Sequence, residues 1–359
     1  MNNERMNNER MGNERMGEGE RFRATAPGRV NLIGDHTDYM GGLALPMAVQ
    51  LATTIEGTRR DGSISLRSAE VDGSVELALP IVDAAAVRPT WGRYVAGVAA
   101  EVGRLDGLAT SGIDAEVRST IPLGSGLSSS AALEVAVALA LGDPGTPLEV
   151  ARRCQRAEQL ATGVPCGIMD QLASASGVDG AALLMDCATD RVTPVVVPAD
   201  AWFHVLHSGQ HRELVGSEYA TRRAQCERAV ELVGPLPVAD DAAIERIDDP
   251  VVRARARHVR SECRRVEVFA EALARGDLAE VGALMTESHR SLRDDFEVST
   301  PALDALVTRL LGTEGVLGAR LTGAGFGGCV VTLTRPGVEL DGWRVLPAPG
   351  ARLEWLGSD

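Results

Sequence analysis

The chain of 359 residues contains no lysine, so that all 36 of its basic residues are arginine. This absence excludes two large classes of nucleotide-binding fold. A Walker A loop needs a lysine after its glycines, and the protein-kinase fold needs a strand lysine beside the nucleotide phosphates. Any phosphate group that this chain binds must therefore contact backbone N–H groups, hydroxyl groups, arginine or a metal ion.

Composition and charge narrow the remaining classes. With 45% hydrophobic and 24% charged residues, the chain has the composition of a soluble globular protein. Its formal net charge of −14 disfavours nucleic acid and anionic membrane surfaces as partners, because both attract surplus positive charge. The six cysteines include no CxxC pair, so we expect neither a disulfide framework nor a zinc site. No apolar run approaches 18 residues and no signal peptide is recognisable, so we expect a cytoplasmic location.

The chain divides into three parts. Residues 1–20 repeat a polar pentapeptide with almost nothing to bury, which predicts a disordered tail. Folded structure is expected to begin near Phe22. After Pro198 the pattern changes from mixed strands and helices to helices rich in Arg, Glu and Ala. The sequence therefore predicts an N-terminal domain over 21–198 and a C-terminal domain over 199–359.

Hydrophobic periodicity predicts the individual elements. Strands are expected over 22–34, 43–55, 112–120, 181–186, 192–197 and 202–208, a hairpin over 63–79, strand, turn and strand over 318–333, and a short strand region over 344–355. Helices are expected over 94–104, 128–141, 148–162, 170–176, 217–232, 250–275 and 277–292.

A Gly/Ser-rich segment, PLGSGLSSSAA, occupies residues 122–132 and leads directly into a predicted helix. Glycine lets the backbone approach a ligand closely, and the first N–H groups of a helix have no partners within it. With the helix dipole they form an anion site suited to a di- or triphosphate. The alternative is a serine N-cap on an ordinary helix.

A second segment, APGRVNLIGDHTDY, occupies residues 26–39 and concentrates polar side chains in an otherwise apolar strand and turn. Carboxylates held at the end of a strand can each accept two hydrogen bonds from neighbouring sugar hydroxyl groups. The alternative is a surface turn rich in Asp and His. A third segment, VPCGIMDQ at 164–171, places Asp170 at an expected helix start, where it is either a base or a helix cap. The glycine-dense segment 320–329 indicates only a tight turn.

These segments, in this order, resemble the GHMP kinase superfamily, and within it the galactokinases. GRVNLIGDHTDY is similar to the galactokinase signature, PLGSGLSSSAALEVA to the phosphate loop and PCGIMDQ to the catalytic segment. The resemblance extends over roughly 22–351. It implies a two-domain α+β fold, with an N-terminal mixed α/β domain, a C-terminal ferredoxin-like α+β domain and an active site in the cleft between them.

The resemblance also implies roles for individual residues. Asp170 would face the sugar C1 hydroxyl group and accept its proton or orient it, and Arg29 would keep Asp170 ionised and stabilise the transferring phosphoryl group. Candidate sugar contacts are Asp35, His36, Thr37, Asp38, Gly167 and Tyr219. Candidate nucleotide contacts are Ser68, Gly124, Ser125, Gly126, Leu127, Ser128, Ser129 and Ser130. Magnesium would be bound by Ser130 and Glu158.

The implied reaction is ATP-dependent phosphorylation of D-galactose at the C1 hydroxyl group by a monomer or weak homodimer. Two alternatives remain open: a kinase for a related sugar such as L-arabinose or N-acetylgalactosamine, and a non-catalytic sugar sensor. One difference from the family signature concerns which sugar is bound. The family signature usually has Glu where this chain has Asp35, a side chain shorter by one C–C bond, about 1.5 Å. The family glutamate reaches the C6 hydroxyl group, so Asp35 leaves that contact open and makes L-arabinose, which lacks C6, a candidate.

Overall fold

The computed structural model describes residues 19–210 and 215–357. The predicted disordered tail, residues 1–20, lies outside this part of the chain except for its last two residues. Within the described residues, no helix is both long and apolar enough to cross a membrane.

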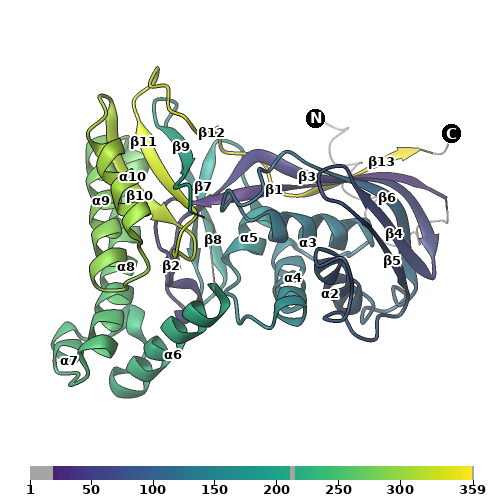
Figure 1. Cartoon of the computed structure of the whole chain (residues 1–359), viewed down its shortest axis with the longest axis horizontal. Coiled ribbons are helices and arrows are strands. Elements are labelled where there is room, and N and C mark those ends of the chain that lie inside the picture. Colours follow the sequence, from purple (N-terminus) through teal and green to yellow (C-terminus); the bar gives the residue numbers. More distant parts are fainter. Residues whose placement is uncertain (1–18, 211–214, 358–359) are drawn as a thin grey trace, which may run out of the picture.

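A six-stranded sheet forms the first half of the molecule, in the strand order β13-β1-β3-β6-β4-β5 (Figure 1). Its strands are β1 (Arg21–Asn31), β3 (Pro46–Asp61), β4 (Ser63–Ser68), β5 (Ser74–Ala78), β6 (Ser111–Ser119) and β13 (Arg352–Gly357). Neighbouring strands are antiparallel except β4 and β6, which run parallel.

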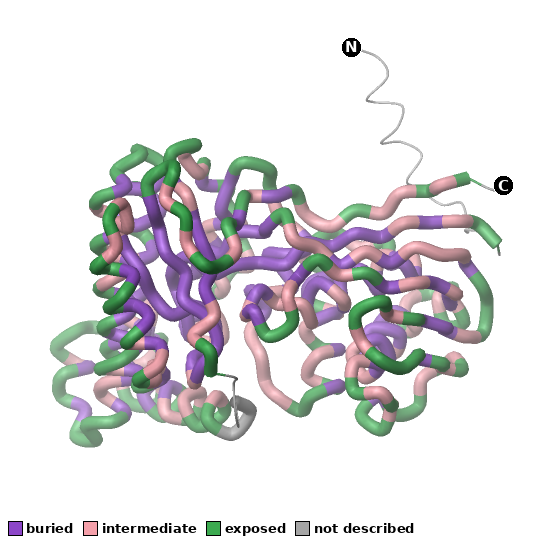
Figure 2. The backbone as a smooth tube through the Cα atoms, turned by 45° about the horizontal axis from the view of Figure 1, so that its top comes forward, coloured by how far each residue is buried: buried purple, intermediate pink, exposed green. Residues whose placement is uncertain are grey.

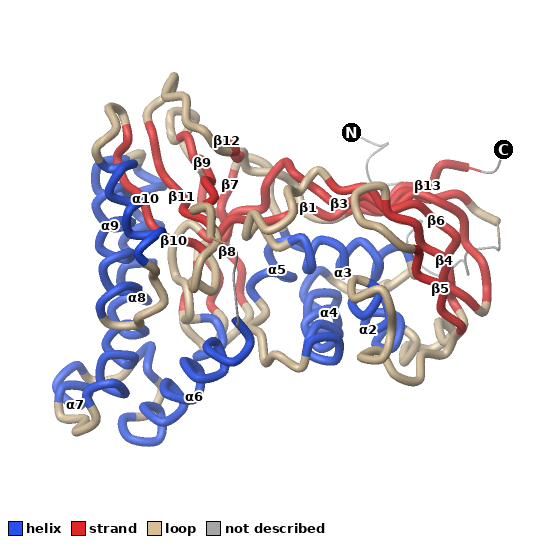
Figure 3. Tube along the Cα trace, viewed as in Figure 1, coloured by secondary structure: helices blue, strands red, loops and turns tan. Residues whose placement is uncertain are grey.

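Four helices cover one face of this sheet (Figure 3). They are α2 (Gly92–Val102), α3 (Ser129–Ala140), α4 (Pro147–Thr162) and α5 (Met169–Ser176). Helix α3 is apolar on nearly all sides, as expected of a helix packed between a sheet and other helices. Helix α4 begins with a capping box, in which Thr146 and Glu149 exchange hydrogen bonds, and ends at Gly163 in the left-handed region.

The second half contains a four-stranded sheet, ordered β10-β11-β9-β12, with its helices packed beside it. The strands are β9 (Trp202–His207), β10 (Val316–Thr322), β11 (Cys329–Thr334) and β12 (Trp343–Val345). The helices are α6 (Val215–Val233), α7 (Asp241–Glu245), α8 (Pro250–Arg275), α9 (Leu278–Asp294) and α10 (Pro301–Leu311). A small sheet of β2 (Leu43–Ala44), β7 (Ala181–Asp186) and β8 (Arg191–Val196) and the short 3₁₀ turns η2 (Asp38–Met40) and η3 (Leu236–Val238) complete the described elements.

Most of the predicted elements are confirmed within a few residues at each end. Some features differ. The short helix α7 was not predicted. Helix α10 was not predicted, although Thr300 caps it and Pro301 occupies its first turn, which together are a recognisable helix start. Strand β13, in the expected strand region near the C-terminus, pairs with β1 and so returns to the first sheet.

The two halves share a buried core. Val30 and Met47, from the first sheet, belong to the same apolar cluster as Phe203 and Phe269, from the second half. The buried stretch of β1 and β3 that leads into this cluster is continuous in Figure 2.

A buried charge cluster fastens the turn after β1 to the second half. Arg320, on β10, is fully buried and donates to the carboxylate of Asp35 and to the carbonyl oxygen of Leu32 at 3.1 Å. Glu262, on α8, accepts from the backbone N–H of Gly34 at 3.0 Å and lies 3.8 Å from Arg320. Burial alone would raise the pKa of Glu262, but the charges around it, Arg265 foremost, lower it to about 2.

We predict that Arg320→Met lowers the free energy of unfolding by about 3–5 kcal/mol, because it leaves the buried carboxylate of Asp35 without its cation and Glu262 with Arg265 alone. Denaturant unfolding followed by circular dichroism would measure this. The matched control is Arg257→Met. Arg257 lies on the same helix as Glu262, but it forms an exposed ion pair with Glu245, so its loss should change the free energy of unfolding little. Equal effects of the two substitutions would contradict the prediction.

Candidate active site

An ion pair between β1 and α5 forms the centre of the site. Arg29 donates from Nε to Oδ1 of Asp170 at 2.8 Å and from Nη2 to Oδ2 at 2.5 Å. Two parallel bonds of this kind fix both the distance and the orientation of the two planar groups. The Arg29 side chain is 6% exposed and the Asp170 side chain 29%, so the carboxylate, rather than the guanidinium, faces open space.

The glycine-rich loop lies directly against this pair. Arg29 Nη1 donates to the carbonyl oxygen of Gly126 at 2.7 Å, and Ser128 Oγ donates to Asp170 Oδ2. Gly124 and Gly126 have φ of 73° and 70°, a conformation that favours glycine. The loop is therefore fixed to the centre of the site by its backbone and by one hydroxyl group.

The serine-cap alternative fails at this helix. Ser128 is the N-cap residue of α3, but its φ is 55° and its side chain makes no capping hydrogen bond. The first N–H groups of a 12-residue helix are thus left without a side-chain cap, which preserves the anion site expected at a helix N-terminus. Ser125 Oγ is also buried, with no hydrogen-bond partner in the described part of the chain.

The cap alternative fails for Asp170 as well. Asp170 lies in the first turn of α5, whose N-cap residue is Ile168, and its carboxylate is bound to Arg29 and Ser128. Each carboxylate oxygen can accept about two hydrogen bonds. Oδ2 accepts from both Arg29 and Ser128, whereas Oδ1 accepts only from Arg29 among the residues that the structure describes. Oδ1 is therefore the oxygen that can accept from a ligand.

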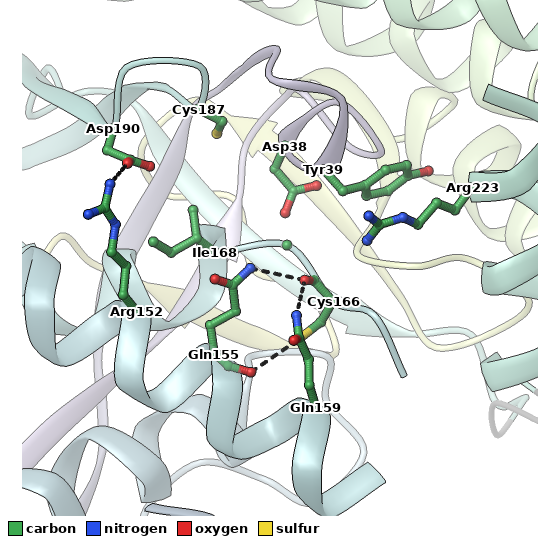
Figure 4. A pocket seen from close by; sticks show the side chains of 11 residues that line it. Asp38, Tyr39, Arg152, Gln155, Gln159, Cys166, Ile168, Cys187, Asp190 and Arg223 are labelled. Carbon is green, nitrogen blue, oxygen red and sulfur yellow. Dashed lines mark hydrogen bonds and ion pairs between the residues drawn. The ribbon is translucent and has the colours of Figure 1, made fainter. Parts of the chain in front are cut away.

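A second carboxylate, Asp38, lies beside the loop that precedes α5. A Cβ atom at Gly167 would lie 1.6 Å from Asp38 Oδ2, so a larger residue there would displace the Asp38 carboxylate. Burial, and then the negative charge of Asp170, raise the pKa of Asp38 to about 6. Asp38 and Gly167 both line a pocket of about 320 Å³, with walls from α4, η2 and the turn after β7 (Figure 4).

The 165–168 loop is held from both halves of the chain. Gln155 and Gln159, on α4, donate to the carbonyl oxygen of Cys166 at 3.1 and 3.3 Å (Figure 4). Arg223, on α6, donates to the carbonyl oxygen of Pro165 at 2.8 Å. The three donors fix the backbone on which Gly167 faces Asp38.

An aromatic cluster lies next to Asp38. The rings of His36 and Tyr219 have centroids 5.6 Å apart, and Tyr39 packs against both. Burial lowers the pKa of His36 to about 4, so its imidazole is neutral at pH 7. Its two nitrogens lie 3.0 Å from Tyr39 OH and 3.2 Å from the carbonyl oxygen of Ala324.

Two predicted sugar-contacting residues are engaged inside the protein instead. Asp35 is 2% exposed, and its oxygens accept from Arg320 and from the backbone N–H of Gly323 at 3.0 Å. Thr37 is fully buried, and its hydroxyl group lies 2.9 and 2.7 Å from the carbonyl oxygens of Gly34 and Leu43. Both side chains stabilise the turn after β1 through buried hydrogen bonds.

The two predicted metal ligands lie together. Ser130 Oγ is 3.3 Å from Glu158 Oε1, at the N-terminal end of α3 beside the glycine-rich loop. Hydroxyl and carboxylate oxygens are ligands that magnesium accepts, and this ion usually takes only one or two carboxylates together with substrate phosphates and water. In the part of the chain that the structure describes, no three His, Cys, Asp or Glu side chains form a metal-binding group. The pair therefore fits an ion that is bound jointly with a phosphorylated ligand.

Ser68 lies elsewhere. It ends β4 and accepts from the backbone N–H groups of Glu70 and Val71, both at 3.2 Å, which makes it part of a tight turn. That turn lines a separate pocket of about 350 Å³ formed by residues 67–74. The structure does not bring Ser68 to the Arg29–Asp170 pair.

The partners of several site residues were not predicted from the sequence. Arg320 was assigned only to a tight turn, and no local pattern marks it as the partner of Asp35, 285 residues away. Gln171 received no role, although its position directly after Asp170 was a usable signal. The hydroxyl group of Ser128 was assigned to a nucleotide rather than to Asp170.

Comparisons with known proteins agree with this geometry. The GHMP kinases N terminal domain matches residues 93–178, the galactokinase galactose-binding signature matches 13–59, and the GHMP kinases C terminal domain matches 269–342. Galactokinase from Homo sapiens is 45% identical over 328 residues, covering 86% of this chain and 82% of that protein. Galactokinase from Canis lupus familiaris is 44% identical over the same shares.

Solved structures give the same result. Galactokinase from Lactococcus lactis, in complex with galactose, is 30% identical, with a TM-score of 0.86 over 93% of this chain and 95% of that one. A mevalonate kinase with 21% identity and a TM-score of 0.62, covering 87% of this chain and 91% of that one, shares the fold.

We predict that the carboxyl group of Asp38 titrates near pH 6 in the ligand-free protein, protonated below this value and ionised above it. Asp170→Asn should lower the pKa of Asp38, because it removes a nearby negative charge. Carbon-13 NMR of the aspartate side chains would follow both. Asp190→Asn, in the same pocket but paired with Arg152, is the control and should leave the titration in place. A titration near pH 4 in all three proteins would refute the prediction.

Proposed function

This chain belongs to the galactokinase family of GHMP kinases, and on that premise we propose that it transfers the γ-phosphoryl group of ATP to the C1 hydroxyl group of D-galactose. The products are α-D-galactose 1-phosphate and ADP. The observation that carries the proposal is the Arg29–Asp170 pair, with the carboxylate open to a ligand and the uncapped N-terminus of α3 beside it.

Asp170 accepts the hydrogen of the C1 hydroxyl group through Oδ1 in this proposal. Arg29 and Ser128 hold the carboxylate in position, so the acceptor oxygen is already oriented before the sugar binds. As phosphoryl transfer proceeds, the hydroxyl proton moves to Oδ1, and the guanidinium of Arg29 stabilises the negative charge that spreads over the transferring group.

The phosphates bind at the glycine-rich loop and the first turn of α3, where backbone N–H groups replace the lysine that this chain lacks. Ser130 and Glu158 are the proposed magnesium ligands. When bound, the ion neutralises charge on the β- and γ-phosphate oxygens. The remaining loop residues, Gly124, Ser125, Leu127 and Ser129, form the rest of the proposed nucleotide site.

Sugar recognition is proposed for Asp38, Gly167 and Tyr219. An ionised Asp38 can accept hydrogen bonds from two neighbouring hydroxyl groups, while Gly167 leaves room for the sugar ring. His36 packs beside them as a neutral ring.

We further propose that the chain comprises an N-terminal domain over 21–198 and a C-terminal domain from 199, with the active site in the cleft between them. Strand β13 is then the segment by which the C-terminal part returns to the first sheet. A cytoplasmic monomer or weak homodimer remains the proposed state.

We predict that Asp170→Asn lowers kcat by about 10²–10⁴-fold, because it removes the proton acceptor while keeping the size of the side chain. ADP release with magnesium-ATP and galactose would measure this. Asp190→Asn in the same pocket is the control and should retain turnover. No turnover by the wild type on any sugar, with galactose binding intact, would favour the non-catalytic sensor instead.

One observation favours a second substrate. Asp35 is only 2% exposed and its oxygens face Arg320 and Gly323, so the C6 hydroxyl group of a bound sugar has little access to this side chain. A site with a dedicated partner for a hydroxyl group rejects the analogue that lacks it by about 10⁴–10⁵-fold.

We therefore predict that kcat/KM for L-arabinose, which lacks C6, lies within about 100-fold of the value for D-galactose, well short of that rejection. Turnover of the two sugars under identical conditions gives the ratio. Turnover on galactose with none on arabinose would show that another group recognises C6.

A further inference from the structure

Gln171 connects three helices directly behind the site. Its Nε2 atom donates to Glu134 Oε2, on α3, at 3.0 Å and to Glu158 Oε2, on α4, at 2.6 Å. A side-chain amide has two N–H donors, so both are used. Successive residues of a helix point about 100° apart, which lets Asp170 face Arg29 while Gln171 faces the two glutamates.

Glu134 serves as a fixed, neutral support for this amide. The residue is fully buried, and neither its Oε1 atom nor Oε1 of Gln171 has a hydrogen-bond partner among the described residues. An ionised carboxylate with a single donor would be costly at such a position. A protonated Glu134 carries no charge and avoids this cost. Burial, and then the charge of Glu158, raise the pKa of Glu134 well above its usual range, in agreement with this state.

The contact with Glu158 determines which of its oxygens is available. Oε2 accepts from Gln171, whereas Oε1 lies towards Ser130. We propose that Gln171 is a positioning residue for the metal: it holds Glu158 so that Oε1 faces the site shared with Ser130. This inference rests on the proposed function, because that function supplies the metal site.

The expected size of the effect follows from the chemistry of magnesium, which requires nearly ideal geometry from its oxygen ligands. Partners that orient a metal ligand typically change metal affinity by about 10–100-fold when they are removed. Loss of Gln171 would free the Glu158 side chain to adopt other rotamers, while the bonds of Asp170 to Arg29 and Ser128 would remain.

The test uses the full chain with ADP and manganese, a paramagnetic substitute for magnesium, and measures free Mn²⁺ by electron paramagnetic resonance. In Gln171→Met, which keeps the length but has no donor, Mn²⁺ affinity should fall by about 10–100-fold. The KM for the sugar should stay within about twofold, and added metal should restore kcat. Gln50→Met is the matched control, since this glutamine donates to the carbonyl oxygen of Arg344 instead and should not alter Mn²⁺ affinity.

Glu134→Gln keeps the shape of the neutral acid and should retain wild-type Mn²⁺ affinity; a loss of about 10-fold in this variant would contradict the neutral support. Gln171→Asn, too short to reach both glutamates, provides a second test if the methionine variant fails to fold, and thermal melting reports folding in each case. Unchanged Mn²⁺ affinity in a folded Gln171 variant would overturn the role of this residue alone. A wild type that binds no Mn²⁺ with ADP would overturn the proposed metal site itself.

Discussion

The two parallel hydrogen bonds between Arg29 and Asp170 determine where everything else in the site must lie. They join a strand of the first sheet to the first turn of a helix that covers it, 141 residues further along the chain. The third donor of the guanidinium binds the carbonyl oxygen of Gly126, and Ser128 binds the same carboxylate. A strand, a helix and a phosphate-type loop therefore meet at one ion pair.

Strand β1, on which Arg29 lies, also contacts the second half of the molecule. Arg29 pairs with Ala48 of β3, and two residues later the backbone carbonyl oxygen of Asn31 accepts from Thr322 Oγ1 at 3.0 Å. The turn that follows is held by buried charge, with Arg320 between Asp35 and Glu262. A buried ion of this kind stabilises only when it is fully paired, so the cluster fixes one arrangement of the turn more than it adds net stability.

Local patterns in the sequence were sufficient to predict most of the elements and the centre of the site. Alternation and helical periodicity located most strands and helices, and the motifs singled out Arg29, Asp170 and the loop between 122 and 132. Contacts between distant segments were not accessible in this way. Arg320 lies on β10, next to a glycine-dense turn, with no local sign that its guanidinium is buried against Asp35, and β13 has no sequence feature that specifies β1 as its partner. A single chain reveals residue types and spacing, whereas pairing across more than 280 residues depends on the folded topology.

Two aspartates of one turn show why residue type alone does not assign a role. Asp35 is buried between a guanidinium and a backbone N–H group, so its charge is compensated inside the protein. Asp38, three residues later, lies against Gly167 with another carboxylate nearby, and its pKa rises to about 6. A raised pKa is typical of a carboxylate that is short of donors, and hydroxyl groups of a ligand are donors. The environment thus compensates the charge of one aspartate inside the protein and raises the pKa of the other.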